Sequence, residues 1–288
     1  MVKVRNFCFY IFPLFFGTVT YAGGAEEVNI KSDVLFHIFG NFPVTNSMLT
    51  SWIFSLILIF IVRRAVGRKP ALIPGRGQAI VESLVEGMYE IFEPVVGKKM
   101  IKHTFPILIG FFVYILIQNW SGLFPGIGTL GRITEHGHLV AFFRPGNADL
   151  NSTLALALIS FIAWGYFAFR YTGPKNLYLH LFGNKADPKG IPILIYGFLF
   201  FIFFGVGVIE VISILFRLVS LSFRLFGNVF GGESLIVSME GVFKFALPVP
   251  FCFLECLIGL IQAFVFSLLV CVYIGLVCNH DEEEGHEH

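Results

Sequence analysis

The sequence predicts an all-α membrane protein with about five transmembrane helices that end in a long tilted helical hairpin, plus one amphipathic surface helix. Of its 288 residues, 56% are hydrophobic and only 14% are charged, and the mean hydropathy is +0.79. Water-soluble domains are usually less apolar and more highly charged. The net charge of +1 hides an uneven distribution, because most lysines and arginines lie in short clusters between apolar runs. No continuous basic face therefore supports nucleic-acid binding.

The first part of the chain is predicted to lie outside the membrane domain. Residues 1–22 combine Lys3 and Arg5 with an apolar stretch and small residues up to Ala22, which is the pattern of a cleavable secretory signal. A short uncleaved first span is the alternative. If the signal is removed, residues 23–45 form a short external N-terminal segment.

Residues 46–279 form the predicted membrane domain. Six apolar runs approach or exceed the roughly 20 residues that a transmembrane helix needs. They cover residues 48–66, 104–124, 151–171, 193–215, 218–242 and 249–278. Between the first two runs, residues 76–102 set apolar side chains such as Ile80 and Leu84 among glutamates at helical spacing. This pattern predicts an amphipathic helix that lies on a membrane face.

The lysines and arginines of the loops predict the orientation of the first three spans. Basic clusters follow the first run, precede the second, and lie between the third and the fourth, so these ends are expected in the cytoplasm. The loop 125–150 carries only Arg132 and Arg144, offset by Glu135 and Asp149. It is therefore expected on the external side.

The remaining apolar segment, residues 193–278, holds either three crossings or two. Two result if residues 193–242 form one long, steeply tilted helix, with Pro248 and Pro250 breaking the chain before the last helix. We favour two, which gives five crossings. The acidic, histidine-containing tail at 280–288 then lies in the cytoplasm.

One arginine is expected deep in the membrane. Glu210, Arg217 and Arg224 recur every seven residues, or two helical turns, so they share a helix face. An arginine at mid-membrane costs about 2.5 to 3.5 kcal/mol on insertion scales and is kept where it faces protein or water. Snorkelling to the interface explains Arg217. Arg224 lies about 10 Å further along the helix axis, and we expect it to be functional.

Polar residues continue beyond Arg224 and recur on the last helix. Asn228 and Glu233 extend the first stripe, while Glu255, Gln262 and Tyr273 share one face of the final run. Two facing polar stripes predict an aqueous path between the helices. For Glu255, a carboxyl that pairs with Lys244 or stays neutral near the turn remains an alternative.

Small and polar residues flank the predicted path. The pairs Gly227/Gly231 and Asn228/Gly232 are each spaced by four, which would let another helix come close. Asn119 flanks the outer loop and is a candidate for hydrating its entrance. The five cysteines lack the C-x-x-C spacing of a zinc or redox site, so no metal and no cofactor is predicted.

The segment SLSFRLFGNVFGGE at 220–233, together with IQAFVFSLLVCVYI at 261–274, resembles subunit a of F-type ATP synthases. The resemblance extends more loosely over residues 46–278. It implies a non-catalytic stator subunit that translocates protons or sodium in the bacterial inner membrane, with the N-terminus outside and the C-terminus cytoplasmic. The implied partners are the c-subunit ring, the b subunits of the peripheral stalk, the rest of the ATP synthase complex and the lipid bilayer.

The resemblance also implies roles for single residues. By it, Arg224 is the essential arginine between two offset half-channels and Gln262 is its neighbour on the following helix. Asn228, Glu233 and Glu255 line the path to the external side, and Glu210 matches a recurring acidic position. Family members often have a histidine in place of either Glu233 or Glu255. Because both positions are acids here, it stays open which of them shuttles protons.

Two other functions compete with the stator subunit. A secondary cation transporter is the alternative, but such proteins often contain internal repeats, and the arginine segment has no second copy in the sequence. An intramembrane hydrolase would need a nucleophile or a metal motif such as H-E-x-x-H, which the sequence lacks.

Overall fold

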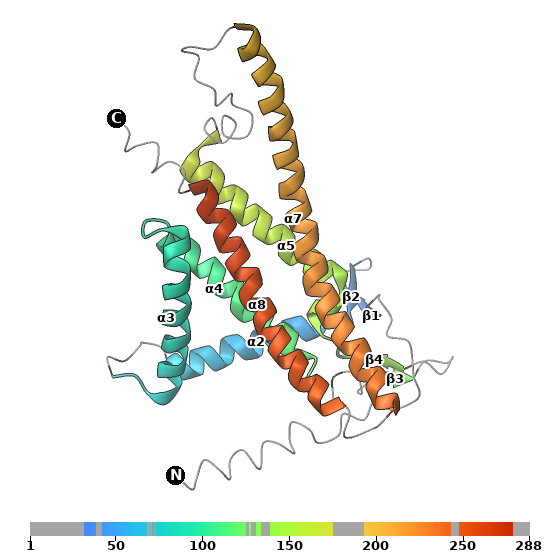
Figure 1. Cartoon of the computed structure of the whole chain (residues 1–288). Helices are drawn as coiled ribbons and strands as arrows, with labels where there is room; N and C mark the ends of the chain where they lie inside the picture. The colour runs from blue at the N-terminus through green and yellow to red at the C-terminus, as the bar shows by residue number, and fades with distance from the viewer. Residues whose placement is uncertain are drawn as a thin grey trace.

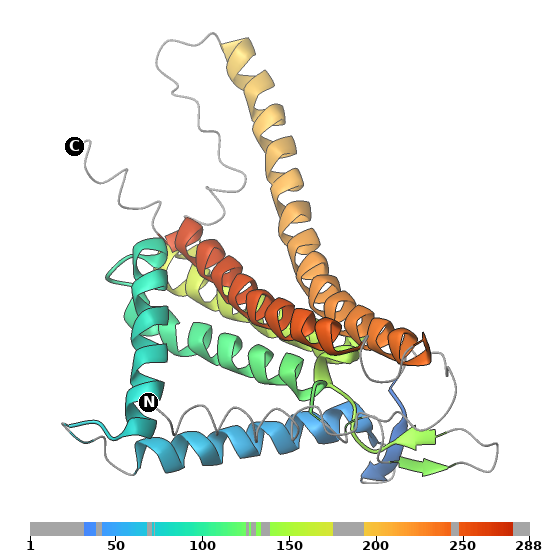
Figure 2. The ribbon, with the colours of Figure 1, turned by 60° about the horizontal axis from the view of Figure 1, so that its bottom comes forward.

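The computed structural model is a bundle of long helices, with short antiparallel strand pairs near one end (Figures 1 and 2). It describes residues 32–38, 42–67, 71, 73–124, 127, 131–133, 139–174, 193–242 and 248–278. The predicted signal at 1–22 and the predicted tail at 280–288 lie outside the described residues.

Within these described ranges, five helices are long and apolar enough to cross a membrane. They are α2 (Asn46–Val66), α4 (Ile101–Ser121), α5 (Leu150–Phe167) with its π-helical extension η2 (Ala168–Thr172), α7 (Ile193–Val242) and α8 (Pro248–Cys278). This number equals the predicted number of crossings. The all-α membrane fold class is therefore confirmed.

Helix α7 joins two of the predicted apolar runs. It continues without interruption for 50 residues from Ile193 to Val242, as the interpretation with two crossings requires. At 1.5 Å per residue it is about 75 Å long, more than twice the roughly 30 Å thickness of a hydrocarbon core. A steep tilt of α7 within the membrane stays a prediction.

The amphipathic helix is shorter than predicted. Helix α3 spans Arg76–Val96, whereas the sequence pattern suggested 76–102. It ends at Gly97, whose φ of 88° favours glycine and whose backbone N–H donates to the Glu93 carbonyl. In Figure 2, α3 runs crosswise to α2 and α4. Its position on a membrane surface remains a prediction.

The apolar core lies where α4 and α8 pack along each other and α3 crosses their ends. The largest fully buried apolar side chains of this core are Phe92, Ile101, Leu108, Ile115, Leu225, Phe266 and Ile274. By contrast, α2 is mostly exposed and only 11% of its apolar window is buried within the chain. Helix α2 therefore presents most of its surface to lipid or to another protein.

Replacing Gly275 with alanine is expected to lower the stability of the isolated chain by about 1–3 kcal/mol. A Cβ at Gly275 would lie 2.5 Å from the backbone oxygen of Val95, so α3 and α8 would have to separate. The melting temperature in detergent measures the effect. Gly165→Ala is the matched control, because no described residue has an atom within 4 Å of its added Cβ. Equal melting temperatures for the two variants would contradict this packing.

The segments at one end of the bundle form structure that the sequence analysis did not predict. Strand β1 (Val34–Ile38) pairs with β2 (Phe42–Thr45), and β3 (Gly131–Ile133) pairs with β4 (Leu139–Ala141). The 3₁₀ turn η1 (Gly146–Ala148) follows β4 and leads into α5. The adjoining ends of α7 and α8 lie at this same end (Figure 1).

Candidate functional site

Arg224 lies on the outer side of α7. Leu221, Leu225 and Val229 are buried against the rest of the bundle, whereas Arg224 is exposed. None of the residues that the structure describes forms a hydrogen bond or an ion pair with its guanidinium. A charged side chain on a membrane helix is costly unless protein or water covers it, so we expect this face of α7 to be covered by protein or water.

Two glycines leave the backbone of α7 without side-chain cover on the same face as Arg224. Gly227 and Gly231 follow Arg224 at helical spacing, both are exposed, and no atom of the described part of the chain lies within 4 Å of a Cβ added at either position. The outer side of α7 therefore has room at these glycines for the second helix whose close approach the sequence predicted. Phe216 and Phe223 on this helix are 69% and 55% exposed, and they add apolar surface around the arginine.

Helices α7 and α8 meet closely at Gly232. The Glu255 carboxyl of α8 lies directly over this glycine, since a Cβ there would stand 2.6 Å from the Glu255 Cδ. Glu233 is the next residue along α7. The structure therefore brings the two candidate acids to one level of the interface between α7 and α8.

A second contact between the polar residues of α7 and α8 lies near the C-terminal end of α8. The Arg217 guanidinium lies 4.6 Å from the centroid of the Tyr273 ring, in the range of a cation–π interaction. Both residues border a small pocket of about 40 Å³ that Trp164 and Ser160 also line. Arg217 thus has a local partner within the chain.

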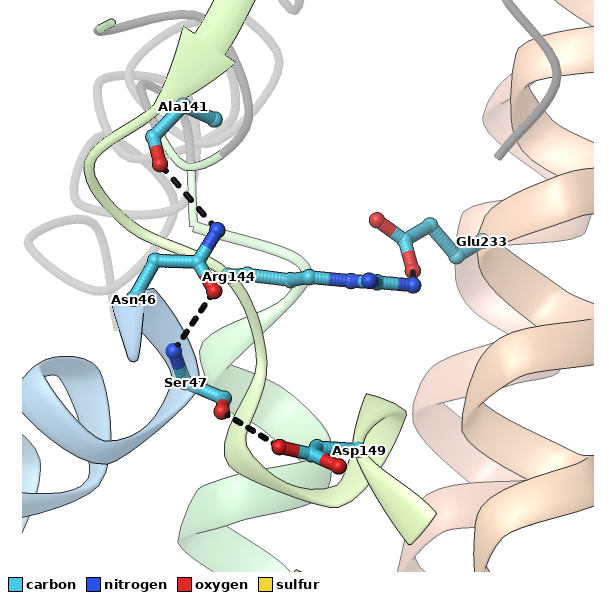
Figure 3. Close-up of polar contacts among 6 residues, drawn as sticks. All are labelled: Asn46, Ser47, Ala141, Arg144, Asp149 and Glu233. Carbon is cyan, nitrogen blue, oxygen red and sulfur yellow. Dashed lines mark hydrogen bonds and ion pairs between the residues drawn. The ribbon is translucent and has the colours of Figure 1, made fainter. Parts of the chain in front are cut away.

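Glu233 forms an ion pair that the sequence analysis missed. The Nη2 atom of Arg144 donates a hydrogen bond to the Oε2 atom of Glu233 at 3.4 Å. Arg144 precedes η1, and its side chain extends across to α7 (Figure 3). In the sequence, Arg144 was noted only as an offset loop charge, and no spacing pattern connects it with Glu233.

Hydrogen bonds to the start of α2 support the segment that carries Arg144. The backbone N–H of Arg144 donates to Thr50 Oγ1 at 3.1 Å. Asn46 Nδ2 donates to the Ala141 carbonyl at 3.1 Å, and Ser47 Oγ donates to Asp149 Oδ2 at 3.0 Å (Figure 3). Residues on both sides of Arg144 are thus attached to one helix, which restricts the position of its guanidinium.

The amide of Asn119 connects three elements. Its Nδ2 atom donates to the Gly259 carbonyl of α8 at 3.0 Å, and its Oδ1 atom accepts a hydrogen bond from Asn147 Nδ2 in η1 at 2.7 Å. Asn119 is only 3% exposed. The structure therefore gives this side chain a packing role between α4, η1 and α8, and its predicted part in hydrating an entrance stays a prediction.

The remaining predicted site residues lie on α7 and α8. Gln262 is buried, and its Nε2 atom has no hydrogen-bond partner among the described residues. Asn228 and Glu210 are each half-buried on α7. Glu210 precedes Arg224 by fourteen residues, or about 21 Å along the helix, so it belongs to a different level from Glu233.

Comparisons with known proteins match this chain to a protein family and to relatives of similar length. The family model described as "ATP synthase A chain" matches residues 48–275. "ATP synthase subunit a" of Moorella thermoacetica is 31% identical over 247 residues, which cover 86% of this chain and 96% of that protein. "ATP synthase subunit a" of Aliarcobacter butzleri is 30% identical over 237 residues, which cover 82% and 91%. "ATP synthase subunit a 2" of a Bradyrhizobium species is 30% identical over 249 residues, which cover 85% and 94%.

Proposed function

Since this chain belongs to the family of ATP synthase subunit a, a non-catalytic, ion-translocating membrane subunit of the FO sector, we propose that it conducts protons through two half-channels. In this proposal Arg224 faces the c-subunit ring and separates the two half-channels. ATP is formed on other subunits of the complex. No bond of ATP is made or broken in this chain.

The observation that carries the proposal is the uncovered arginine on the outer face of α7. Arg224 is exposed beside Gly227 and Gly231, and no described residue comes within 4 Å of a Cβ added at either glycine. Small residues let a neighbouring helix approach the backbone closely. A ring of helices that each carry a carboxyl would cover this face and bring a partner of opposite charge to the guanidinium.

The permanent charge of Arg224 accounts for coupling. A ring carboxyl that faces lipid keeps its proton, because the charged form is disfavoured in a low dielectric, whereas a nearby cation favours release. The same cation repels other cations, so a proton cannot pass directly between the half-channels and must travel with the ring. Each charge that crosses 100 mV supplies about 2.3 kcal/mol, and this drives rotation.

The polar residues are assigned to the two half-channels. Glu233, Glu255 and Asn228 belong to the external path, and Asn119 holds α8 against η1 beside it through its two hydrogen bonds. Glu210 belongs to the cytoplasmic path. Gln262 is assigned as the neighbour of Arg224 on α8, as the resemblance to the family implies. This assignment is supported by the contact of Glu255 with Gly232. The contact lies near the connection between α7 and α8, which is predicted to be on the external side.

Partners and location follow from the same family membership. The rest of the ATP synthase complex is the partner of a subunit a, and we assign the largely exposed helix α2 to the b subunits of the peripheral stalk. We place the chain in a bacterial inner membrane with the C-terminus in the cytoplasm. The basic clusters of the loops support this orientation.

A crosslink from the face of Arg224 tests the proposed function. In a variant without the five native cysteines, a photo-crosslinker attached at Gly231→Cys is expected to yield a product with the c subunit, identified by mass spectrometry of the whole complex. The matched control is Ser160→Cys, because Ser160 is only 6% exposed and should give no such product. A secondary transporter would give none from either position, and that result would reject the stator assignment.

A further inference from the structure

We infer that Arg144 is a positioning residue of the external half-channel. Its guanidinium holds Glu233 as a charged partner, and Glu255 is then the carboxyl that exchanges the proton. This inference rests on the proposed function of the chain. It goes beyond that function, because it adds a second arginine to the pathway and separates the roles of the two acids.

The pair between Arg144 and Glu233 is shielded from water. The Nη2 and Oε2 atoms lie 3.4 Å apart, and the two side chains are only 9% and 15% exposed. In such surroundings each charge depends on the other, because removing one partner leaves the second buried without compensation. The guanidinium of Arg144 therefore stabilises the ionised carboxylate of Glu233 and fixes its direction.

The position of this guanidinium is determined by contacts between elements. The backbone of Arg144 is held by Thr50 of α2, with the Arg144 nitrogen 3.1 Å from Thr50 Oγ1. On the other side of η1, Asp149 caps α5 by accepting a hydrogen bond from the Asn151 N–H at 3.0 Å and also accepts one from Ser47 of α2. A guanidinium on a segment anchored at both sides can orient a second group precisely, as a support for a functional site must.

Among the residues that the structure describes, which do not include Lys244, Glu255 has no comparable partner. Its carboxyl lies over Gly232, beside Glu233 in the sequence, and its buried Oε2 atom forms no hydrogen bond with any described residue. Two carboxylates that share a site of low dielectric are not both ionised readily. Arg144 compensates one negative charge and is paired with Glu233, so Glu255 is the group that gains and loses a proton.

The proton and charge balance of the cluster is simple. When Glu255 is protonated, the positive charge of Arg144 and the negative charge of Glu233 cancel. When the O–H bond of Glu255 breaks and the proton passes to a ring carboxyl, the cluster carries one net negative charge. This charge attracts the next proton from external water, and a new O–H bond forms on Glu255.

The test is ATP-driven proton pumping by the complete ATP synthase complex in proteoliposomes, with rates normalised to assembled complex. Glu255→Gln is expected to reduce pumping to background. Arg144→Gln and Glu233→Gln are each expected to lower it about tenfold, the factor that corresponds to the loss of one charge-assisted hydrogen bond. Arg144→Lys, which keeps the charge, should recover most of the loss. Arg132→Gln in β3 removes the same charge from the same connection and should pump at the wild-type rate.

The double variant Arg144→Gln with Glu233→Gln separates a charge partner from a general support of the fold. It is expected to pump no more slowly than Glu233→Gln alone, because no carboxylate then needs the guanidinium. This comparison also decides the matter if Arg144→Gln alone does not assemble. A further tenfold loss in the double variant would overturn the inference, as would background pumping by Glu233→Gln together with continued pumping by Glu255→Gln.

Failure of this inference can be told from failure of the proposed function. Arg224→Ala is measured in the same preparations. If that variant is inactive while the results for Arg144 or Glu255 differ from expectation, only the assignment of the external cluster is wrong. If Arg224→Ala pumps normally, the stator mechanism itself is wrong.

Discussion

Replacing Arg224 with alanine is expected to abolish ATP-driven proton pumping by the reconstituted complex, while the complex still assembles. The guanidinium is exposed and has no partner among the described residues of the chain, so its loss leaves no buried charge uncompensated within the subunit. An opposite charge within about 4 to 6 Å changes the ionisation equilibrium of a carboxyl by about ten- to a thousandfold. A ring carboxyl that passes alanine would keep its proton, and rotation would no longer be coupled to transfer.

Arg217→Ala is the matched control for this variant. It removes the same charge from the same helix two turns earlier, where the guanidinium lies 4.6 Å from the Tyr273 ring centroid. Because this contact is internal to the chain, we expect its loss to affect the stability of the chain more than coupling. The measurement is quenching of a pH-sensitive dye in proteoliposomes. Equal losses in both variants, or normal pumping by Arg224→Ala, would reject a special role for Arg224.

Gly232→Ala is expected to lower proton pumping by about ten- to a hundredfold while the melting temperature of the chain stays nearly unchanged. The added Cβ would overlap the end of the Glu255 side chain, whose Cδ lies 2.6 Å away. This carboxyl can rotate aside at little cost to packing, but it then leaves its place beside Glu233. A displacement of about 1 Å in a reacting group can cost on the order of a hundredfold in rate.

Two alanine substitutions serve as controls for Gly232→Ala. Gly275→Ala meets the backbone of Val95 at 2.5 Å, which cannot move aside, so it should show the opposite pattern with a clear loss of stability. Gly205→Ala adds the same methyl group to α7 where nothing lies within 4 Å, and it should change neither quantity. If Gly232→Ala melted as early as Gly275→Ala, its effect on pumping would reflect misfolding and not the position of Glu255.

Elements that a local sequence pattern specifies were predicted well, and elements without such a pattern were missed. The bounds of α2 and α8 lie within two residues of the predicted apolar runs, since a long apolar run is a local property of the chain. The end of α3 was predicted six residues too late, at 102 instead of Val96. Gly97 was the available signal, because glycine commonly follows the last residue of a helix. The strands β3 and β4 were missed because three-residue strands carry no measurable periodicity.

For the candidate site as well, the sequence predicted some features and only the tertiary structure revealed the others. The sequence alone predicted about five membrane crossings and singled out Arg224 as a costly charge in the membrane, because run length and the desolvation of an arginine depend on neighbours along the chain. Only the tertiary structure decided that Glu255 lies over Gly232 and that Arg144 reaches Glu233, 89 residues away in the sequence. Such contacts depend on how α2, α7, α8 and the segment before α5 pack together, and no periodicity within one helix encodes that arrangement.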